Sequence, residues 1–201
     1  MRLYHSPTTP FGRKVMVLIQ ETGLPVEVVE VSGTPIAPGT LPLDRNPLGK
    51  IPALERDDGR VLYDSRVICR YLDDLAGAGL YGDTPGLWDV LVLEATADGI
   101  LDAAVLMVYE ARLRPEDKRY EAWVAAQWAK VTRALDAVEA GWTLHLAGRL
   151  DMGQVALGCA LEYLDFRHDA RNWRDGRPQL AAWAAGFGQR PAMLATVPPA
   201  Q

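Results

Sequence analysis

The first part of the chain combines two strand-like segments with one amphipathic stretch. Arg2–His5 and Val26–Val31 have the length and pattern of short strands. The side chains that recur at helical spacing between them are Val15, Leu18, Ile19 and Thr22. Gly23 and Pro25 are the stop signals of this helix. A strand, a helix and a parallel strand form a right-handed crossover unit, and this order predicts one.

Two further strands follow a segment rich in turn residues. Residues 32–45 are loop-like, with scattered Gly and Pro and at most one turn of helix. Residues 53–55 and 61–63 are predicted as strands, and Asp57-Asp58-Gly59 between them is a strong hairpin signal. A helix then opens at Asp64-Ser65, and its apolar positions are Ile68, Tyr71, Leu72 and Leu75. The predicted order up to this point is βαβαββα.

The pattern becomes helical throughout after a Gly-rich segment. Residues 77–86, GAGLYGDTPG, are interpreted as a linker between a domain at 1–76 and a second domain at 87–201. Helices are predicted over 87–112, 116–142, 148–166 and 178–186. The buried positions predicted for the first of them are Leu91, Ala95, Leu101, Ala104, Val105 and Val108. The second domain is therefore expected to be all-helical.

Local signals in the second domain concern one helix start and the end of the chain. Asp151 and Gln154 have capping-box spacing, in which Gln154 returns a bond to the backbone of the cap. The final stretch, PAMLATVPPA, is predicted to be extended.

Composition excludes several partners. The 201 residues include 21 Lys and Arg against 26 Asp and Glu, a net charge of −5. Broad nucleic-acid binding needs a basic face, so no nucleic-acid partner is expected. No apolar run approaches the ~18 residues that cross a bilayer, and no leader precedes the first strand. The sequence therefore predicts a cytoplasmic protein that does not bind membranes.

Metal and thiol chemistry are also not indicated. His145 and His168 have no Cys or carboxylate at metal spacing, so no metal is expected. Cys69 and Cys159 fall within apolar helical patterns and are predicted to be buried hydrophobic side chains.

The stretch from Asn46 to Ser65 contains the chemistry of a binding site. Pro52 cannot donate to a strand ladder, so it belongs at a strand start and leaves the backbone of Ile51 free to bond an extended peptide. Ser65 at the start of a helix is a typical cap, and the helix start also provides free N–H groups for an anion. The stretch therefore predicts a surface for a small extended ligand with an acidic end.

The order of these pieces resembles the glutathione-binding half of the glutathione S-transferases. In that family a cis-proline bonds the cysteinyl backbone of glutathione, and an acidic residue followed by Ser holds its γ-glutamyl group. The resemblance assigns these roles to Pro52 with Ile51 and to Asp64 with Ser65, where the family often has Glu at the first of the pair. Lys50 either reaches the glycyl carboxylate, as a basic residue does in relatives, or is a solvated surface side chain.

The resemblance extends into the second half of the chain. Residues 97–103, 161–167 and 172–174 are similar to patterns of a bacterial subgroup of the family. The resemblance therefore implies an N-terminal thioredoxin-like βαβαββα domain, followed by an all-helical glutathione-transferase C-terminal domain with a second-substrate pocket. It also implies a homodimer with a role in detoxification.

The turn after the first strand is where the family places a hydroxyl or thiol that activates glutathione. This turn offers Ser6, Thr8 and Thr9. Thr9 is favoured because it directly precedes Pro10-Phe11, as the Cys or Ser does in related members; Thr8 is second and Ser6 third. The alternative is that all three hydroxyls cap the helix. No Cys occupies the turn, so glutaredoxin-like exchange lacks its nucleophile.

The resemblance implies an enzyme with glutathione as co-substrate and a small hydrophobic electrophile as the other partner. One alternative is a non-catalytic binding or regulatory module, which the Thr in place of Ser keeps open. A second alternative is a glutathione-dependent isomerase or dehalogenase. Arg13 and Lys14 are predicted on the surface of the first helix. Three residues near the end of the next long helix either line the second-substrate pocket or lie in the core and solvent: Met107, Tyr109 and Arg112.

Overall fold

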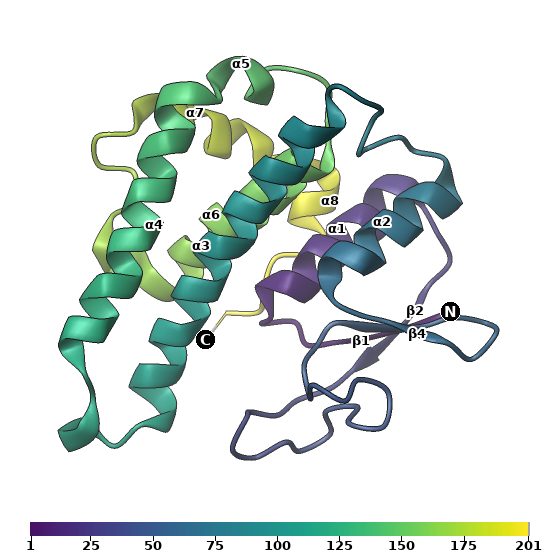
Figure 1. Cartoon of the computed structure of the whole chain (residues 1–201), viewed down its shortest axis with the longest axis horizontal. Coiled ribbons are helices and arrows are strands. Elements are labelled where there is room, and N and C mark those ends of the chain that lie inside the picture. The colour runs from purple at the N-terminus through teal and green to yellow at the C-terminus, as the bar shows by residue number, and fades with distance from the viewer. Residues whose placement is uncertain (201) are drawn as a thin grey trace. The chain divides into compact units, whose positions relative to one another are not determined.

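The computed structural model describes residues 1–200, which form two compact units (Figure 1). The first unit contains residues 1–83 together with the segment that begins at Pro191, and the second is Thr84–Arg190. None of the described helices combines the length and the apolar character that a membrane span requires. Among the described residues, no three His, Cys, Asp or Glu side chains converge in a way that would hold a metal ion.

The first unit is built on a sheet with the strand order β2-β1-β3-β4. Its strands are β1 (Arg2–His5), β2 (Glu27–Glu30), β3 (Ala53–Glu55) and β4 (Val61–Leu62). β1 is parallel to β2 and antiparallel to β3, and β3 and β4 form an antiparallel hairpin. The predicted crossover and the predicted hairpin are both confirmed.

Two helices accompany this sheet, α1 (Pro10–Thr22) and α2 (Ser65–Ala76). They lie side by side on the same side of the strands (Figure 1). Gly23 ends α1 in the left-handed conformation with φ 68°, which a residue without a Cβ adopts at little cost. Between β2 and β3 the chain runs through turns, so the middle helix of the predicted βαβαββα order is replaced by a loop.

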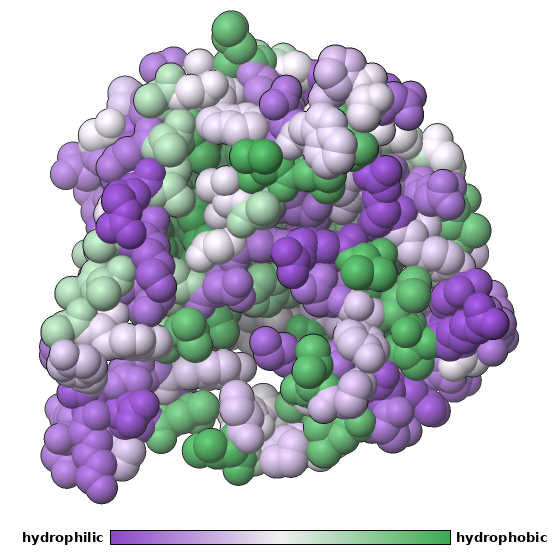
Figure 2. All heavy atoms as spheres, viewed as in Figure 1, coloured by the Kyte–Doolittle hydropathy of each residue, from purple (hydrophilic) through white to green (hydrophobic). Residues whose placement is uncertain are grey.

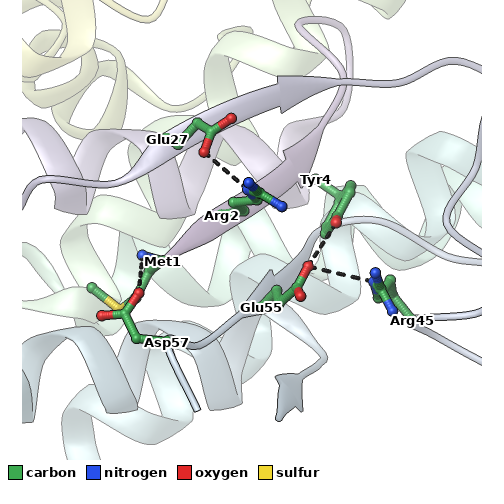
Figure 3. A network of polar contacts seen from close by, with 7 residues as sticks. All are labelled: Met1, Arg2, Tyr4, Glu27, Arg45, Glu55 and Asp57. Carbon is green, nitrogen blue, oxygen red and sulfur yellow. Dashed lines mark hydrogen bonds and ion pairs between the residues drawn. The ribbon is translucent and has the colours of Figure 1, made fainter. Parts of the chain in front are cut away.

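Polar side chains on the outside of the sheet connect neighbouring strands (Figure 3). Arg2 Nε donates to Glu27 on β2 at 3.0 Å, and the Tyr4 hydroxyl donates to Glu55 on β3 at 2.7 Å. Arg45 forms an ion pair with the same Glu55 at 3.4 Å, which ties the loop before β3 to the sheet. Exposed pairs of this kind contribute little to stability, so their effect is to hold register and loop position.

The C-terminal segment returns to the first unit instead of remaining extended. It forms α8 (Pro191–Leu194), which packs on α1. Arg13 Nη2 donates to the carbonyl oxygen of Met193 at 3.1 Å, and the Met193 side chain is fully buried. The prediction of an extended tail was therefore wrong for Pro191–Leu194. So was the prediction that Arg13 and Lys14 lie on the surface, because both are buried.

The second unit consists of helices. They are α3 (Leu87–Leu113), α4 (Glu121–Gly141), α5 (Thr143–Leu146), α6 (Met152–His168) and α7 (Pro178–Phe187), with single 3₁₀ turns at Glu116–Lys118 and Asp169–Arg171. α3 packs along both α4 and α6 (Figure 1). α6 is buried around most of its circumference, which explains its high apolar content.

Two details of the helical unit differ from the sequence predictions. The buried positions of α3 are centred on Leu93, Ala97, Ile100, Leu101, Ala104 and Met107. Ala95 is exposed, and Leu91, Val105 and Val108 are only half-buried. Asp151 caps α6 by accepting from Gln154 N at 2.9 Å, as predicted, but Gln154 Nε2 donates to the carbonyl of His145 and returns no bond to the cap.

Hydrophilic and hydrophobic residues are interspersed over the face drawn in Figure 2. Large apolar side chains with high exposure include Leu144, Ile36 and Leu48. Single exposed apolar residues are ordinary on protein surfaces. Surface hydropathy alone therefore identifies no site, and the polar groups have to be considered one by one.

The burial of Met193 gives a direct test of the C-terminal segment. Met193→Ala is expected to lower the free energy of unfolding by about 2–5 kcal/mol, because it removes a fully buried side chain from the contact with α1. Leu194→Ala is the matched control, since Leu194, the next residue on α8, is 54% exposed. This substitution should change stability by less than about 0.5 kcal/mol. Denaturant unfolding measures both, and equal effects would contradict the packing of α8.

Candidate functional site

The sheet register brings three separate segments to one end of the first unit. Tyr4 on β1 pairs with Ala53 on β3, so the antiparallel continuation places the turn after β1 beside Ile51 and Pro52. Leu54 pairs with Leu62 on β4, which carries Pro52 alongside the residues that follow β4, Tyr63 and Asp64. The hydroxyl-bearing turn, the proline and the acidic helix start thus converge at this end of the sheet.

The segment before β3 is held by a buried asparagine. Asn46 Nδ2 donates to the carbonyl of Lys50 at 2.8 Å, and Asn46 Oδ1 accepts from Leu48 N at 3.0 Å. The side chain is 2% exposed, so these bonds are shielded from water. The sequence pattern gave Asn46 no role of its own. The signal for the turn it closes is Gly49 three residues later, whose N donates to Asn46 O at 2.9 Å.

The Ile51–Pro52 peptide bond is cis, as the family resemblance implied. Pro52 is buried and Ile51 is half-buried at the start of β3. Lys50 is exposed, and its carbonyl is already engaged by Asn46. The backbone around Ile51 therefore lies at the edge of the converging segments, with a cation directly before it.

The start of α2 is capped by Asp64 and not by Ser65. Asp64 has an extended backbone, and its carboxylate accepts from Arg66 N at 3.1 Å. Ser65 is already the first helical residue and is 3% exposed. The prediction that Ser65 caps the helix was wrong, because the residue before it has the conformation and the acceptor that a cap needs.

The carboxylate of Asp64 is ionised under ordinary conditions. Burial favours its neutral form, but the hydrogen bonds and charge of Arg66, which donates Nη2 to Asp64 Oδ2 at 2.8 Å, lower its pKa. The charge of Lys14 acts in the same direction. Lys14 is fully buried on α1. The sequence had placed this cation on the surface, but its charge acts on the carboxylate of the site from inside the fold.

The hydroxyl of Thr9 is not used to cap α1. Thr9 occupies the N-cap position, but its side chain makes no capping hydrogen bond, and Pro10 follows as the first helical residue. Ser6 Oγ and Thr8 Oγ1 lie 3.4 Å apart and pair with each other. The alternative that all three hydroxyls serve as caps is therefore wrong for Thr9, the residue that the resemblance favoured.

His5 and Gly12 determine the position of the Thr9 methyl group. A Cβ at Gly12 would overlap His5 Nδ1 and lie 2.7 Å from Thr9 Cγ2, so the imidazole and the methyl group share the space that Gly12 leaves open. The methyl group thus faces the first turn of α1, and the hydroxyl occupies the other branch of Cβ. His5 Nδ1 is buried without a hydrogen-bond partner, and burial lowers the pKa of His5 to about 4.

Family models match both units of the chain. The model of the glutathione S-transferase N-terminal domain matches residues 3–79, and that of the C-terminal domain matches residues 121–186. The chain is 33% identical to the uncharacterized GST-like protein YibF of Escherichia coli strain K12, over 99% of each sequence.

Solved structures give the same result. A glutathione transferase family member from Pseudomonas fluorescens Pf-5, determined with bound glutathione, is 47% identical over 99% of each chain with a TM-score of 0.96. A second structure of a family member from that source contains S-(propanoic acid)-glutathione and matches with 45% identity over the whole of both chains and a TM-score of 0.90.

The buried imidazole predicts how stability depends on pH. Because the pKa of His5 is lowered from 6.5 to about 4 in the folded state, the unfolded chain binds more protons between these values. The folded state is therefore at its most stable, as far as His5 is concerned, above the unfolded pKa, and it loses stability as the pH falls towards 4. Between pH 7 and pH 5, His5 should lower the free energy of unfolding by about 2 kcal/mol. His5→Leu should remove this part of the dependence of stability on pH.

Denaturant unfolding at several pH values measures this difference. His168 also has a lowered pKa, chiefly from burial, so its contribution has the same sign and remains in both proteins. The difference between the two slopes therefore isolates His5. Parallel slopes in the two proteins would show that His5 is not held neutral by the fold.

Proposed function

Because the chain belongs to the glutathione S-transferase family, we propose that it binds glutathione, stabilises the thiolate with Thr9 and transfers the sulfur to a small hydrophobic electrophile. The observation that carries this proposal is the free hydroxyl of Thr9 at the N-terminus of α1. It stands at the end of the sheet where the register also brings Pro52 and Asp64.

In this proposal glutathione lies as an extended peptide beside the segment that precedes β3. The backbone of Ile51 next to Pro52, ahead of the paired residues of β3, bonds its cysteinyl residue in the manner of strand addition. Asp64 and Ser65 hold the γ-glutamyl group, and Lys50 approaches the glycyl carboxylate. The Pseudomonas fluorescens relative with bound glutathione supports this ligand, since 99% of each chain aligns at 47% identity.

Thr9 is proposed to donate its hydroxyl hydrogen bond to the sulfur. A free thiol has a pKa of about 8.5, and only the thiolate is nucleophilic. Each unit by which the pKa falls corresponds to about 1.4 kcal/mol. A hydroxyl donor and the positive end of α1 act in the same direction, because both stabilise negative charge on sulfur.

The transfer itself forms one sulfur–carbon bond. The thiolate electron pair attacks the electrophilic carbon, and a leaving group departs with its bonding pair. Where the substrate is an activated alkene, the thiolate adds to it without a leaving group, and the displaced π electron pair takes up a proton. The relative that contains S-(propanoic acid)-glutathione supports a site with room for a substituent on sulfur.

A binding module without turnover is the second candidate function. The observation that favours it is the methyl group of Thr9, which lies against the space shared by His5 and Gly12. A β-branched side chain has few χ1 rotamers, so the hydroxyl cannot turn freely towards a sulfur. A bound thiol with an unshifted pKa would select this candidate.

We propose that the protein is a homodimer and that the outer face of α2 contacts the second copy. An open groove of about 610 Å³ is lined there by Leu62, Arg66, Val67, Arg70, Tyr71 and Asp74. Val67 is 48% exposed at its apolar centre. Arg70 and Asp74 are one turn apart, so a copy related by a twofold axis can pair each with the other.

The thiol titration tests the proposed function. Thiolate absorbance of glutathione is followed against pH with the protein in excess, and the midpoint should fall one to two units below that of free glutathione. Thr9→Ala should return it towards the free value because it removes the donor. Thr8→Ala is the matched control, and it should leave the midpoint lowered because Thr8 pairs with Ser6.

Binding is followed in the same samples. Asp64→Ala and Ser65→Ala should each weaken glutathione binding at least tenfold, which is about 1.4 kcal/mol, without changing the midpoint of the bound thiol. If neither substitution weakens binding, the proposed site is wrong. If Thr8→Ala and Thr9→Ala shift the midpoint equally, Thr9 is not the donor.

The dimer is tested by light scattering at several protein concentrations. Val67→Asp should shift the mass from two chains to one, because it places an unpaired charge at the apolar centre of the groove. Val28→Asp, at a residue 42% exposed on β2, is the control and should leave the dimer intact. A wild-type mass of one chain at all concentrations would overturn the proposal.

A further inference from the structure

The C-terminal halves of α3 and α6 bring two arginines and two tyrosines together within the second unit. Tyr109 and Arg112 are three residues apart on α3, and Tyr163 and Arg167 are four apart on α6, so each pair shares one helix face. The two pairs lie close enough for Arg112 to act on Arg167 and for Tyr109 to act on Tyr163. His168 Nε2 lies 3.0 Å from the carbonyl of Ala104 and fixes α6 against α3 at this level.

Arg167 is the member of this cluster in which two hydrogen-bond donors have no partner. Its guanidinium lies over the Phe166 ring at 4.0 Å and interacts with the Tyr163 hydroxyl. Its Nε and Nη1 atoms are both buried and have no hydrogen-bond partner. A basic residue in the last turn of a helix commonly bonds the free carbonyls there, but these two atoms bond none.

The carboxylates near the cluster are engaged elsewhere. Asp165 accepts from Trp173 Nε1 and from Arg174 Nη2, both at 2.7 Å. Glu110 pairs with Arg114 at 2.8 Å. In the part of the chain that the structure describes, no carboxylate forms an ion pair with Arg167.

The neighbours of Arg167 add positive charge and neutral donors. Burial is the main cause that lowers the pKa of Arg167, and the charge of Arg112 acts in the same direction. Burial also raises the pKa of Tyr163 to about 12, so this hydroxyl stays protonated and donates. A site with two cations, hydroxyl donors and aromatic surface is complementary to a carboxylate on an apolar body.

We propose that Arg112, Arg167, Tyr109 and Tyr163 bind the carboxylate of a small aromatic or aliphatic acid. The anion supplies the acceptors that the buried Nε and Nη1 atoms of Arg167 lack. Buried polar groups in folded proteins are nearly always paired, and a planar guanidinium matches a carboxylate with two parallel bonds. Where the proposed transferase function also holds, this site selects a negatively charged electrophile as second substrate.

Calorimetry of the full chain with benzoate, in the absence of glutathione, tests the anion site. Benzoate should bind at least tenfold more tightly than benzamide, which has the same shape without the charge. Arg167→Gln should abolish that preference and leave benzamide unchanged. Equal binding of the two probes to the wild-type protein would overturn the proposal.

Arg171→Gln is the matched control. Arg171 lies in the turn that follows α6, is exposed over the Trp128 ring at 5.1 Å, and acts on His168 as Arg167 does. If its loss weakens benzoate as much as the loss of Arg167, the effect is general charge and the proposal fails. Thermal unfolding separates anion binding from a structural role, because removal of a half-buried charge without a carboxylate partner should leave Tm unchanged or raise it.

A second measurement distinguishes this inference from the proposed function on which its substrate part rests. Glutathione and 4-chloro-3-nitrobenzoate are compared with glutathione and the corresponding benzamide; sulfur displaces chloride, which leaves with its bonding pair. Arg167→Gln should lower kcat/KM at least tenfold for the benzoate only. Turnover without preference for the benzoate overturns the anion site alone. Benzoate binding without glutathione binding supports the anion site and overturns the transferase.

Discussion

The pairing of β3 with β1 on one side and β4 on the other is the constraint on which the candidate site depends. The segments of the site follow β1 and β4 and precede β3, and the register determines that these segments become neighbours. A shift of one residue would turn every side chain to the other face of the sheet. Leu3 and Leu54, which pair with each other and are fully buried, oppose such a shift.

Three buried polar side chains belong to the segments that form the site. Asn46, Lys14 and His5 are almost fully buried, although their residue types are usually exposed or paired at a surface. Asn46 is satisfied by the loop that it closes, and Lys14 stands near the carboxylate of Asp64. His5 remains neutral because of burial. The first unit thus accepts a cost in stability where its segments converge, which is common at functional sites.

In the second unit, the notable buried polar atoms belong to an arginine. Several arginines of this unit have a carboxylate partner or bond a backbone carbonyl, as Arg177 does with Asp136 and with the carbonyl of Trp173. Arg167 differs from these, because it is half-buried against the Phe166 ring and its Nε and Nη1 atoms are both buried without a hydrogen-bond partner, which the anion proposal explains. The sequence offered Tyr109 and Arg112 as candidates for a second-substrate pocket but did not show that α6 would meet them with Tyr163 and Arg167.

The sequence by itself determined most of the elements, the hairpin, the crossover and the family, because these follow from periodicity, turn residues and the order of local motifs. It also located Pro52, Asp64 and the hydroxyl turn. Tertiary structure alone decided the burial of Arg13 and Lys14, the return of Met193 to α1 and the buried face of α3. The physical reason is that a helical pattern gives the faces of a helix, whereas burial depends on which distant segments pack against each face.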